Sequence, residues 1–494
     1  MGGKKYAIMK KNTLIIYSVL FGLFAINFAY ASEINQKKVT IYQVMQRVLD
    51  RYPSLKISEM EVAQAAEQRQ QIESSLGWIL NGALGATHDL TGFGSPSDRV
   101  DIRGSFDRQL QSGATLSLGG SYRYEDSSLP FDPLPNPAHT TRLDISYRLP
   151  LAKGEGNPLY LEGMISADAS HDLAKANQLL TRITLAEKVK DLFYSSVFTL
   201  ARIKNAKQDV HRARQLNVYI NKNVKLGLLE KKDQLQALAQ LNAKLADLST
   251  IELIWIQQQN SLNRLMLEDW EEVTQPILSP TNDYGNYDIY NLIRKTENYH
   301  PAVVISKAEL EIAESQINSA RDNKKDSLDF VVSVGSRTSN GDNTAGSVRE
   351  HDFAGAVSFE YRHLFDNKGV SSKHKQALIE KNIALQNIKK TNNDIRYTVS
   401  GLVTEIKIAK IAVKAMHKKL KSESLKLDEV VQRFRSGRAD TEQLIKFQNV
   451  YSLAELTYQN QKIELNNRII ALQIFTGQFW DELTNRNVKY GVTK

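Results

Sequence analysis

The sequence predicts an α+β protein that contains two copies of one structural unit, in which long coiled-coil helices are combined with β-strands. Three observations support this: residues recur at nearly constant offsets, apolar residues follow a heptad period over long stretches, and other segments alternate between apolar and polar residues. The chain has 494 residues, 41% of them hydrophobic and 24% charged, and no cysteine. Disulfides, iron–sulfur clusters, Cys-ligated zinc and a thiol nucleophile are therefore excluded.

The internal repeat is visible in matching segments. Pro53–Ser58 is repeated by Pro301–Ser306 after 248 residues, and Tyr147-Arg148 is repeated by Tyr361-Arg362 after 214 residues. The offset falls by 34 between these positions, so the first copy carries about 34 extra residues there. The copies cover roughly 39–272 and 287–483, and the Pro-containing stretch between them is typical of a linker with a short helix.

The helical segments have the period of a coiled coil. From Ile395 to Phe434 the apolar residues are spaced alternately by four and three positions, with Glu423 the one exception. A helix over 158–226 would be about 100 Å long, at roughly 1.5 Å per residue. Gly227 and Gly437 follow the two long helices and are typical helix-ending residues, so the next helices are expected to run back antiparallel.

The strand segments have two contrasting faces. Leu143, Ile145 and Tyr147 alternate with Asp144 and Ser146, and the other strand segments follow the same pattern. Segments of about ten residues with an apolar and a charged face are typical of a transmembrane barrel with an aqueous lumen. Because a self-contained barrel needs about eight strands, more than the two or three hairpins of one chain provide, a homo-oligomer is expected.

The N-terminus has the pattern of a secretory signal. Lys4, Lys5, Lys10 and Lys11 precede an apolar stretch, and Ala29-Tyr30-Ala31 precedes the expected cleavage site. No later run is long and apolar enough for a transmembrane helix. The whole chain has a net charge of +9, which becomes +5 once the four lysines are removed. A charge this small over this length does not indicate nucleic-acid binding.

These patterns divide the chain into nine segments. They are the signal peptide (1–31), first-repeat N-terminal helices (32–77), first-repeat strands (78–151) with an extra hairpin at about 99–125, a long helical hairpin (152–272), a linker (273–300), the second-repeat helix (301–326), the second-repeat β-hairpin (327–366), a second long helical hairpin (367–483) and a C-terminal tail (484–494).

Over essentially the whole mature chain, this order of elements resembles the TolC family of outer-membrane efflux proteins. The local marks are Tyr147–Leu151, Leu226–Leu228, Ser436–Arg438 and Phe475–Trp480, together with the duplication. The resemblance implies a homotrimer in outer-membrane lipid, with a twelve-stranded barrel to which each chain gives four strands, and a periplasmic helical tunnel. Eighteen strands would result if the extra hairpin joined the barrel, but twelve are expected.

The resemblance also implies partners and a gated tip. The partners would be a periplasmic adaptor (membrane fusion) protein, docking around Gly227 and Gly437, and an inner-membrane pump of the resistance-nodulation-division or ABC type, the latter serving type I secretion. Asp440 and Glu442 are the candidate pore-aperture acids. The candidate tip latch consists of Glu230, Asp233, Arg435 and Arg438. These acids could instead be ordinary residues at helix N-termini, stabilised by the helix dipole.

No catalytic motif is present, so neither enzyme activity nor a cofactor is expected. The chain lacks a phosphate-binding G-x-x-x-x-G-K-[ST] loop, H-E-x-x-H and G-x-S-x-G, and its nine histidines lack metal-ligand spacing. Two alternatives to an export channel remain. A trimeric coiled-coil surface protein without transport activity would have one stalk and one strand anchor, and a periplasmic enzyme or binding protein would have a compact polar pocket.

Overall fold

The computed structural model describes residues 37–89, 96–127, 135–279 and 287–489. The predicted signal peptide, residues 1–31, lies outside the described residues. The chain divides into two units. Unit 1 contains the described residues up to Pro53, together with Arg182–Ile293 and those from Thr398 on; unit 2 contains Ser54–Thr181 and Arg294–Tyr397.

The helices confirm the duplication, because four pairs of helices have equal lengths. These pairs are α2 (Ile41–Arg51) and α6 (Ile289–Tyr299) with 11 residues, α3 (Pro53–Ser74) and α7 (Pro301–Asp322) with 22, α4 (Pro158–Lys225) and α8 (Lys368–Arg435) with 68, and α5 (Lys231–Met266) and α9 (Thr441–Thr476) with 36. The expected C-terminal tail differs, since α10 (Gln478–Lys489) continues the helical structure across position 484.

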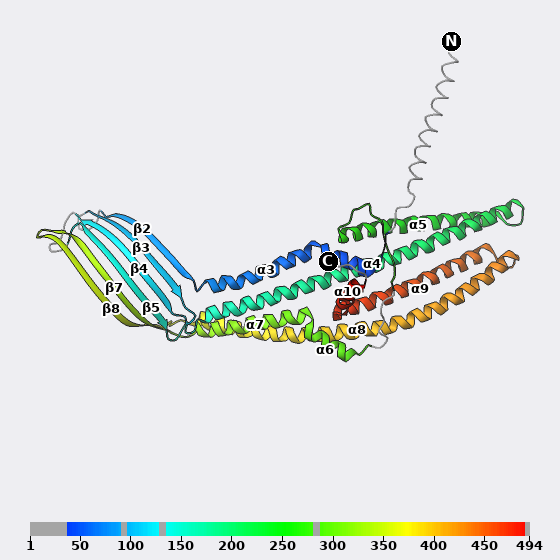
Figure 1. Ribbon diagram of the computed structural model, residues 1–494. Coiled ribbons are helices and arrows are strands. Elements are labelled where there is room, and N and C mark those ends of the chain that lie inside the picture. The colour runs from blue at the N-terminus through cyan, green and yellow to red at the C-terminus, as the bar shows by residue number, and fades with distance from the viewer. Residues whose placement is uncertain (1–36, 90–95, 128–134, 280–286, 490–494) are drawn as a thin grey trace, which may run out of the picture. The chain divides into compact units, whose positions relative to one another are not determined.

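Unit 1 has a core of apolar side chains from five helices. Met45 of α2, Phe193 of α4, Leu262 of α5, Ile470 of α9 and Phe479 of α10 are almost completely buried. Each such side chain contributes roughly 1.5–3 kcal/mol by burial. A short parallel pair, β1 (Lys37–Val39) with β6 (Thr274–Pro276), was not expected from the sequence. Figure 1 shows α5 returning beside the C-terminal part of α4, and α9 beside that of α8.

The two hairpin turns of unit 1 have the same geometry. Gly227 and Gly437 have φ values of 71° and 73°, in the left-handed region that favours glycine. In the first turn, the N–H of Leu228 donates to the carbonyl of Asn223 (2.8 Å) and that of Gly227 to Val224 (3.0 Å). The second turn repeats both bonds, which together form a Schellman motif. Glycine therefore ends both long helices, as the sequence predicts.

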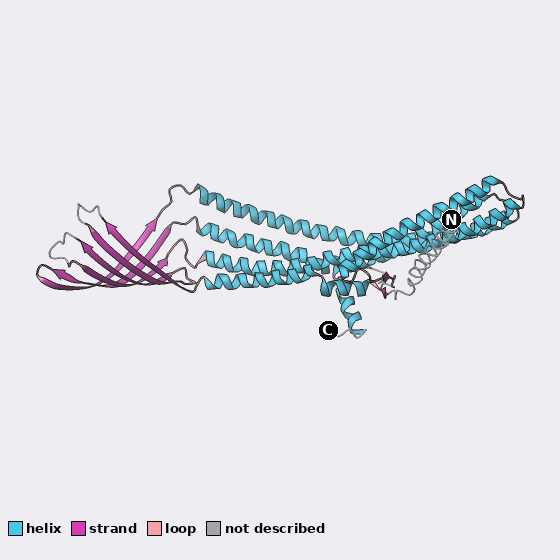
Figure 2. Ribbon diagram, turned by 90° about the horizontal axis from the view of Figure 1, so that it is seen from above, coloured by secondary structure: helices cyan, strands magenta, loops and turns pink. Residues whose placement is uncertain are grey.

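Unit 2 contains one six-stranded antiparallel sheet, in the order β2-β3-β4-β5-β7-β8 (Figure 2). The strands are β2 (Trp78–Asp89), β3 (Ser97–Gln109), β4 (Thr115–Ser127), β5 (Ala138–Pro150), β7 (Ser327–Asn343) and β8 (Gly346–Arg362). The extra hairpin is β3–β4, and its turn contains Gly113 with φ 87°. It lies between β2 and β5 as a full member of the sheet. The expectation that each chain gives four strands is therefore wrong, since one sheet contains six.

No helix among the described residues is long and apolar enough to cross a membrane.

Substituting Gly437→Ala should lower the free energy of unfolding by about 1–2 kcal/mol, because a Cβ is strained in the left-handed region. Gly401→Ala is the matched control: Gly401 lies inside α8, and a Cβ added there would meet open space. There alanine should stabilise the helix by up to about 1 kcal/mol. Thermal unfolding in detergent, followed by circular dichroism, measures both. Equal effects of the two substitutions would contradict the assigned turn.

Candidate functional site

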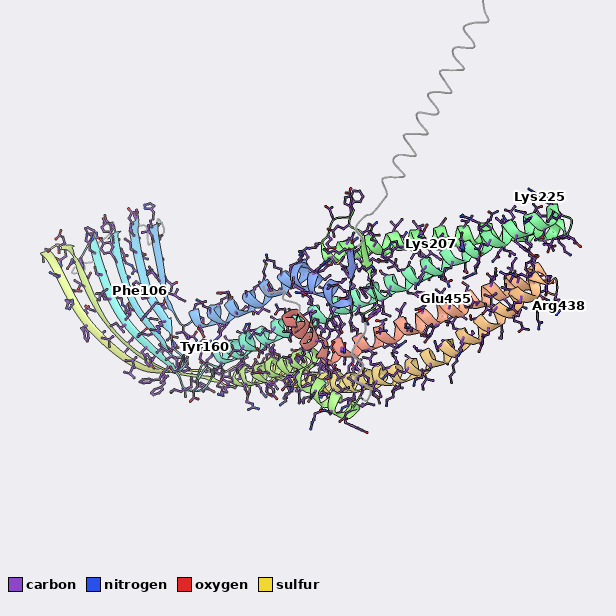
Figure 3. The ribbon with its side chains drawn as sticks, turned by 45° about the vertical axis from the view of Figure 1, so that its right-hand side comes forward. Phe106, Tyr160, Lys207, Lys225, Arg438 and Glu455 are labelled. Carbon is purple, nitrogen blue, oxygen red and sulfur yellow. The ribbon has the colours of Figure 1, made fainter. Side chains whose placement is uncertain are left out.

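The sheet exposes an apolar face to its surroundings. Leu84 of β2 is 76% exposed and Phe353 of β8 is 73% exposed, although both side chains would be buried in an ordinary sheet. The register continues this face across all six strands. It carries Leu80, Leu84, Ile102, Phe106, Leu118, Leu143, Ile145, Val334, Phe353, Val357 and Phe359. The label in Figure 3 marks Phe106 on this sheet. An apolar face of this extent needs lipid or protein to cover it.

Aromatic residues lie toward both ends of the apolar face. Trp78 begins β2, whereas Tyr124 lies near the other end of β4, where its ring is 5.2 Å from that of His139. Tyr124 and Ala86 are both register partners of Val100, so Tyr124 lies level with Ala86. Ala86 in turn lies eight residues beyond Trp78 along β2. This spacing corresponds to about 26 Å along a strand. It matches the aromatic girdles that flank the lipid-facing band of outer-membrane barrels.

The opposite face of the sheet is charged and hydrogen-bonded. Arg123 of β4 contacts Asp101 of β3 at 2.7 Å, and Arg148 of β5 contacts Asp329 at 3.0 Å and Glu360 at 2.6 Å. All three ion pairs lie on this face; two of them connect neighbouring strands, and the pair of Arg148 with Glu360 reaches across β7. The sheet therefore has the sidedness predicted from the alternating sequence.

Both edges of the sheet are open within the described part of the chain. β2 pairs only with β3, and β8 only with β7. The free edges are 12 and 17 residues long, and unpaired edge groups of this kind readily pair with another strand. Since six is an even number, β8 of one copy and β2 of another would meet in antiparallel orientation.

The two hairpin turns of unit 1 lie side by side and line a common groove of about 710 Å³. Of the predicted tip residues, the structure brings together Glu230, Asp233, Arg435, Arg438, Gly437 and Asp440 around this groove. Tyr219 and Phe434 also line the groove and bring the two hairpins into contact, with ring centroids 5.7 Å apart. Figure 3 labels Lys225 and Arg438 at the two turns. Glu442 and Gly227 do not line the groove.

The charges at the tip are arranged differently from the predicted latch. Lys232, which the sequence analysis missed, contacts Glu230 at 3.1 Å. The hydrogen bond to Glu230 and the nearby charges of Glu230, Asp233 and Asp440 raise the pKa of Lys232. Arg435 and Arg438 are exposed and make no ion pair among the described residues. Their role in a latch stays a prediction.

The candidate aperture acids have different local roles. Asp440 is the N-cap of α9, and its carboxylate accepts a hydrogen bond from the N–H of Gln443 at 2.7 Å. Glu442 is exposed in the first turn of the same helix. Asp233 likewise accepts a hydrogen bond from the N–H of Glu230, at 3.2 Å. Helix capping therefore explains Asp440 and Asp233 locally, whereas Glu442 has no such explanation.

A polar network between α4 and α9 was missed by sequence analysis. Ser452 of α9 has its hydroxyl 2.7 Å from Asn205 Oδ1 and 2.6 Å from Asp209 Oδ2, and Asn205 donates to Glu455 at 3.1 Å. The Asp209 side chain is only 11% exposed and forms an ion pair with Arg212. The polar positions 205, 209 and 212 border the apolar seam of α4, a stripe that could have indicated the network.

The described residues contain no group of three metal-ligating side chains placed to hold an ion.

Comparison with known proteins identifies the fold. No family model matches the sequence, and no curated protein matches it significantly. Among solved structures, the outer-membrane channel OprN has 14% identity and a TM-score of 0.64, covering 88% of this chain and 89% of its own. VceC of Vibrio cholerae has 13% identity and a TM-score of 0.65 (88% and 96% covered), and CmeC of Campylobacter jejuni 14% and 0.60 (88% and 85%).

These matches define the class of fold as that of outer-membrane channels. More particularly, the structures matched are TolC-family outer-membrane efflux channels, which have periplasmic helical tunnels. The long helices combined with an antiparallel sheet, predicted from the repeat, the heptads and the alternating segments, are confirmed, whereas the trimer and the closed barrel stay predictions.

Substitutions at Asp440 should separate capping from charge. Asp440→Asn should change the free energy of unfolding by only a few tenths of a kcal/mol, because asparagine caps as well as aspartate, whereas Asp440→Ala should cost about 1 kcal/mol. Urea unfolding of the detergent-solubilised protein, followed by helical circular dichroism, measures the difference. If both variants lost the same stability, the carboxylate charge and not the cap would be the stabilising feature.

Proposed function

We propose that three copies of this chain form an outer-membrane channel with a periplasmic tunnel, through which substrates leave a tripartite efflux pump or a type I secretion system. The observation that carries the proposal is the six-stranded sheet, which is apolar on one face, charged on the other and open at both edges. In lipid, every backbone polar group must be hydrogen-bonded internally. Closure by further copies satisfies this requirement, with the apolar face toward lipid and the charged face toward water.

Three copies would close a barrel of eighteen strands. With a strand spacing of about 4.8 Å and a tilt of about 40°, its backbone diameter would be roughly 36 Å, against about 24 Å for twelve strands. Barrels of 16–18 strands are wide enough for an aqueous channel. The protein would therefore offer passing substrates an unusually wide exit for its fold.

The tip would be the closed end of the conduit. Asp440 and Glu442 from three chains would place carboxylates around a narrow opening and favour cations. The Asn205–Asp209–Ser452 network would hold α4 against α9, because breaking a largely buried ion pair or hydrogen bond costs several kcal/mol. Opening would require this network and the tip contacts to separate.

An inner-membrane pump would supply the energy for export, because the sequence has no nucleotide-binding loop. A periplasmic adaptor would dock on the turns, where the exposed Leu226 and Leu228 flank Gly227. The alternative of a surface protein with one stalk and one strand anchor is not favoured, since both copies contribute a helical hairpin and strands of the same sheet.

Cysteine cross-linking tests barrel closure, and the chain has no native cysteine to interfere. Leu84→Cys on β2 should be combined in turn with Phe353→Cys, Gly355→Cys and Val357→Cys on β8. Oxidation of at least one combination should give covalent dimers and trimers on a denaturing gel, because these positions share the apolar face. Leu84→Cys with Ser358→Cys, on the opposite face, is the matched control. The absence of cross-links across the series, or ladders beyond three chains, would contradict the proposal.

Planar-bilayer recording tests the channel and its tip. The wild-type protein should give small, mostly closed openings that prefer cations, because three sets of tip carboxylates attract them. The double variant Asp440→Asn, Glu442→Gln should show a weaker cation preference, measured as a reversal potential in a KCl gradient. Lys231→Gln, also on the first turn of a tip helix, is the control for a general effect of substitution. Unchanged selectivity in the double variant would remove the aperture assignment.

A further inference from the structure

Two arginines face each other on neighbouring strands of the sheet. Arg142 of β5 and Arg337 of β7 are in direct register, on the charged face. Arg103 of β3 lies in the same row, connected through Ser121. Like charges directly opposite each other in an antiparallel pair are destabilising. The sheet therefore keeps an unfavourable pair of like charges at this position. Elsewhere between the same two strands, Val334 lies opposite Ile145, which is an ordinary apolar pair.

Two neighbouring acids, Asp101 and Glu125, already form ion pairs with arginines. Asp101 contacts Arg123 at 2.7 Å and Arg103 at 3.6 Å, and Glu125 contacts Arg99 at 3.0 Å. The negative charges of both acids are therefore already paired with arginines of β3 and β4.

Three more acids lie around the arginine pair. Asp352 is the register partner of Arg337 on the edge strand, Glu350 lies two residues before it, and Asp144 lies over Gly119. None of them makes an ion pair with Arg142 or Arg337 in the described part of the chain. Of these three acids only Glu350 lines the common pocket, whose lining carries four arginines and three acids (Asp101, Glu125 and Glu350), so that one arginine is in excess among the lining residues.

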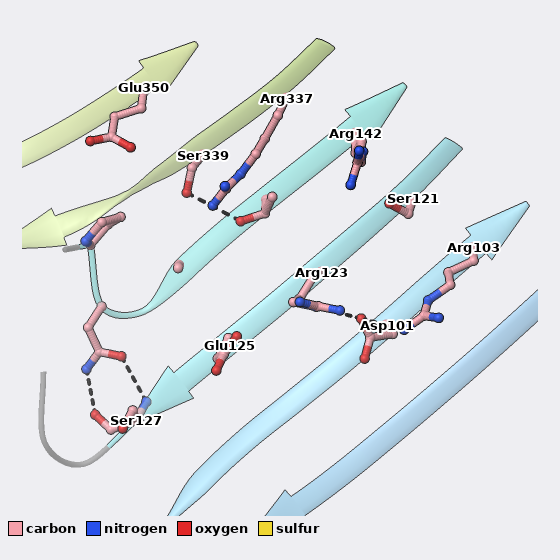
Figure 4. A pocket seen from close by; sticks show the side chains of 14 residues that line it. Asp101, Arg103, Ser121, Arg123, Glu125, Ser127, Arg142, Arg337, Ser339 and Glu350 are labelled. Carbon is pink, nitrogen blue, oxygen red and sulfur yellow. Dashed lines mark hydrogen bonds and ion pairs between the residues drawn. The ribbon is translucent and has the colours of Figure 1, made fainter. Parts of the chain in front are cut away.

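The pocket around these arginines is built for an anionic group. Its volume is about 550 Å³, within the range of ligand sites, and it lies on the charged face (Figure 4). Hydroxyl groups of Ser121, Thr140 and Ser339 lie beside the guanidinium groups, and Thr140 Oγ1 is 3.3 Å from Ser339 Oγ. Guanidinium forks and hydroxyl donors together match the oxygens of phosphate and carboxylate groups.

We propose that Arg142 and Arg337, with Arg103 beside them, form a binding site on the channel wall for a phosphate or carboxylate group of exported cargo. That this site faces the lumen of a channel rests on the proposed function. In a trimer it would recur three times in one belt, so that an anionic substrate leaving the tunnel would meet cationic positions in the barrel. Lipid phosphates would be kept away from it, because the apolar face is on the other side of the sheet.

Equilibrium dialysis with radiolabelled inorganic phosphate tests the site on the full-length protein in detergent. The wild type should bind phosphate saturably, and Arg142→Gln with Arg337→Gln should weaken binding by at least about tenfold, since charged hydrogen bonds are lost. The matched control is Arg108→Gln with Arg349→Gln, which removes the same charge from the apolar side of the sheet and should bind as the wild type does.

Thermal unfolding gives a second readout that does not depend on retained activity. Phosphate should raise the Tm of the wild type and of the control but not that of the Arg142/Arg337 variant. Without phosphate, that variant should unfold at the same temperature as the wild type or higher, because a like-charge pair has been removed. Absence of saturable phosphate binding by the wild type, or equal loss in both double variants, would overturn the proposal. Loss of channel openings in bilayers would instead count against the proposed function.

Discussion

The sheet of unit 2 has edges without a strand partner and an apolar face without a cover in the described part of the chain, and most other features of the molecule follow from this. In the part of the chain that the structure describes, its six strands leave two unpaired edges, and its apolar face is exposed at residues such as Leu84 and Phe353. Exposed edges and faces of this size are strong drivers of association. A closed barrel in lipid removes both at once, because the edges pair with each other and the apolar face meets acyl chains.

At the two hairpin turns of unit 1, several charged side chains lie close together around one groove. Capping gives Asp440 and Asp233 a structural role within their own helices. The interface between α4 and α9 carries polar contacts of its own, centred on the partly buried Asp209. Polar contacts inside an otherwise apolar helical interface fix register at some cost in stability, which would suit the separation of α4 from α9 that the proposed opening requires.

Sequence reasoning was most successful where the signal was periodic. The heptads between Ile395 and Phe434, the glycines at 227 and 437 and the 34 extra residues predicted the helices, both turns and the extra hairpin. It failed where the outcome depended on non-local pairing. The sequence contains no mark that places β3–β4 inside the sheet, because register is set by strands that are far apart in the chain.

The predicted tip latch shows the same limit at the level of side chains. Glu230, Asp233, Arg435 and Arg438 line one groove at the turns, yet Lys232, and not an arginine, pairs with Glu230 in the described part of the chain, and the latch itself stays a prediction. Long exposed side chains choose among several partners of similar energy, so composition alone cannot assign the pairs.

The added hairpin has a topological consequence. β3 runs back from the end of the sheet where β2 finishes, and β4 returns the chain to that end, from which β5 starts. Trp78 and Pro158 therefore keep their positions as the points where strands and helices meet. An insertion of two antiparallel strands preserves the parity of the sheet. The circumference of the proposed pore could thus grow in evolution by steps of one β-hairpin per protomer, without any change in the number of helices that would build the proposed tunnel.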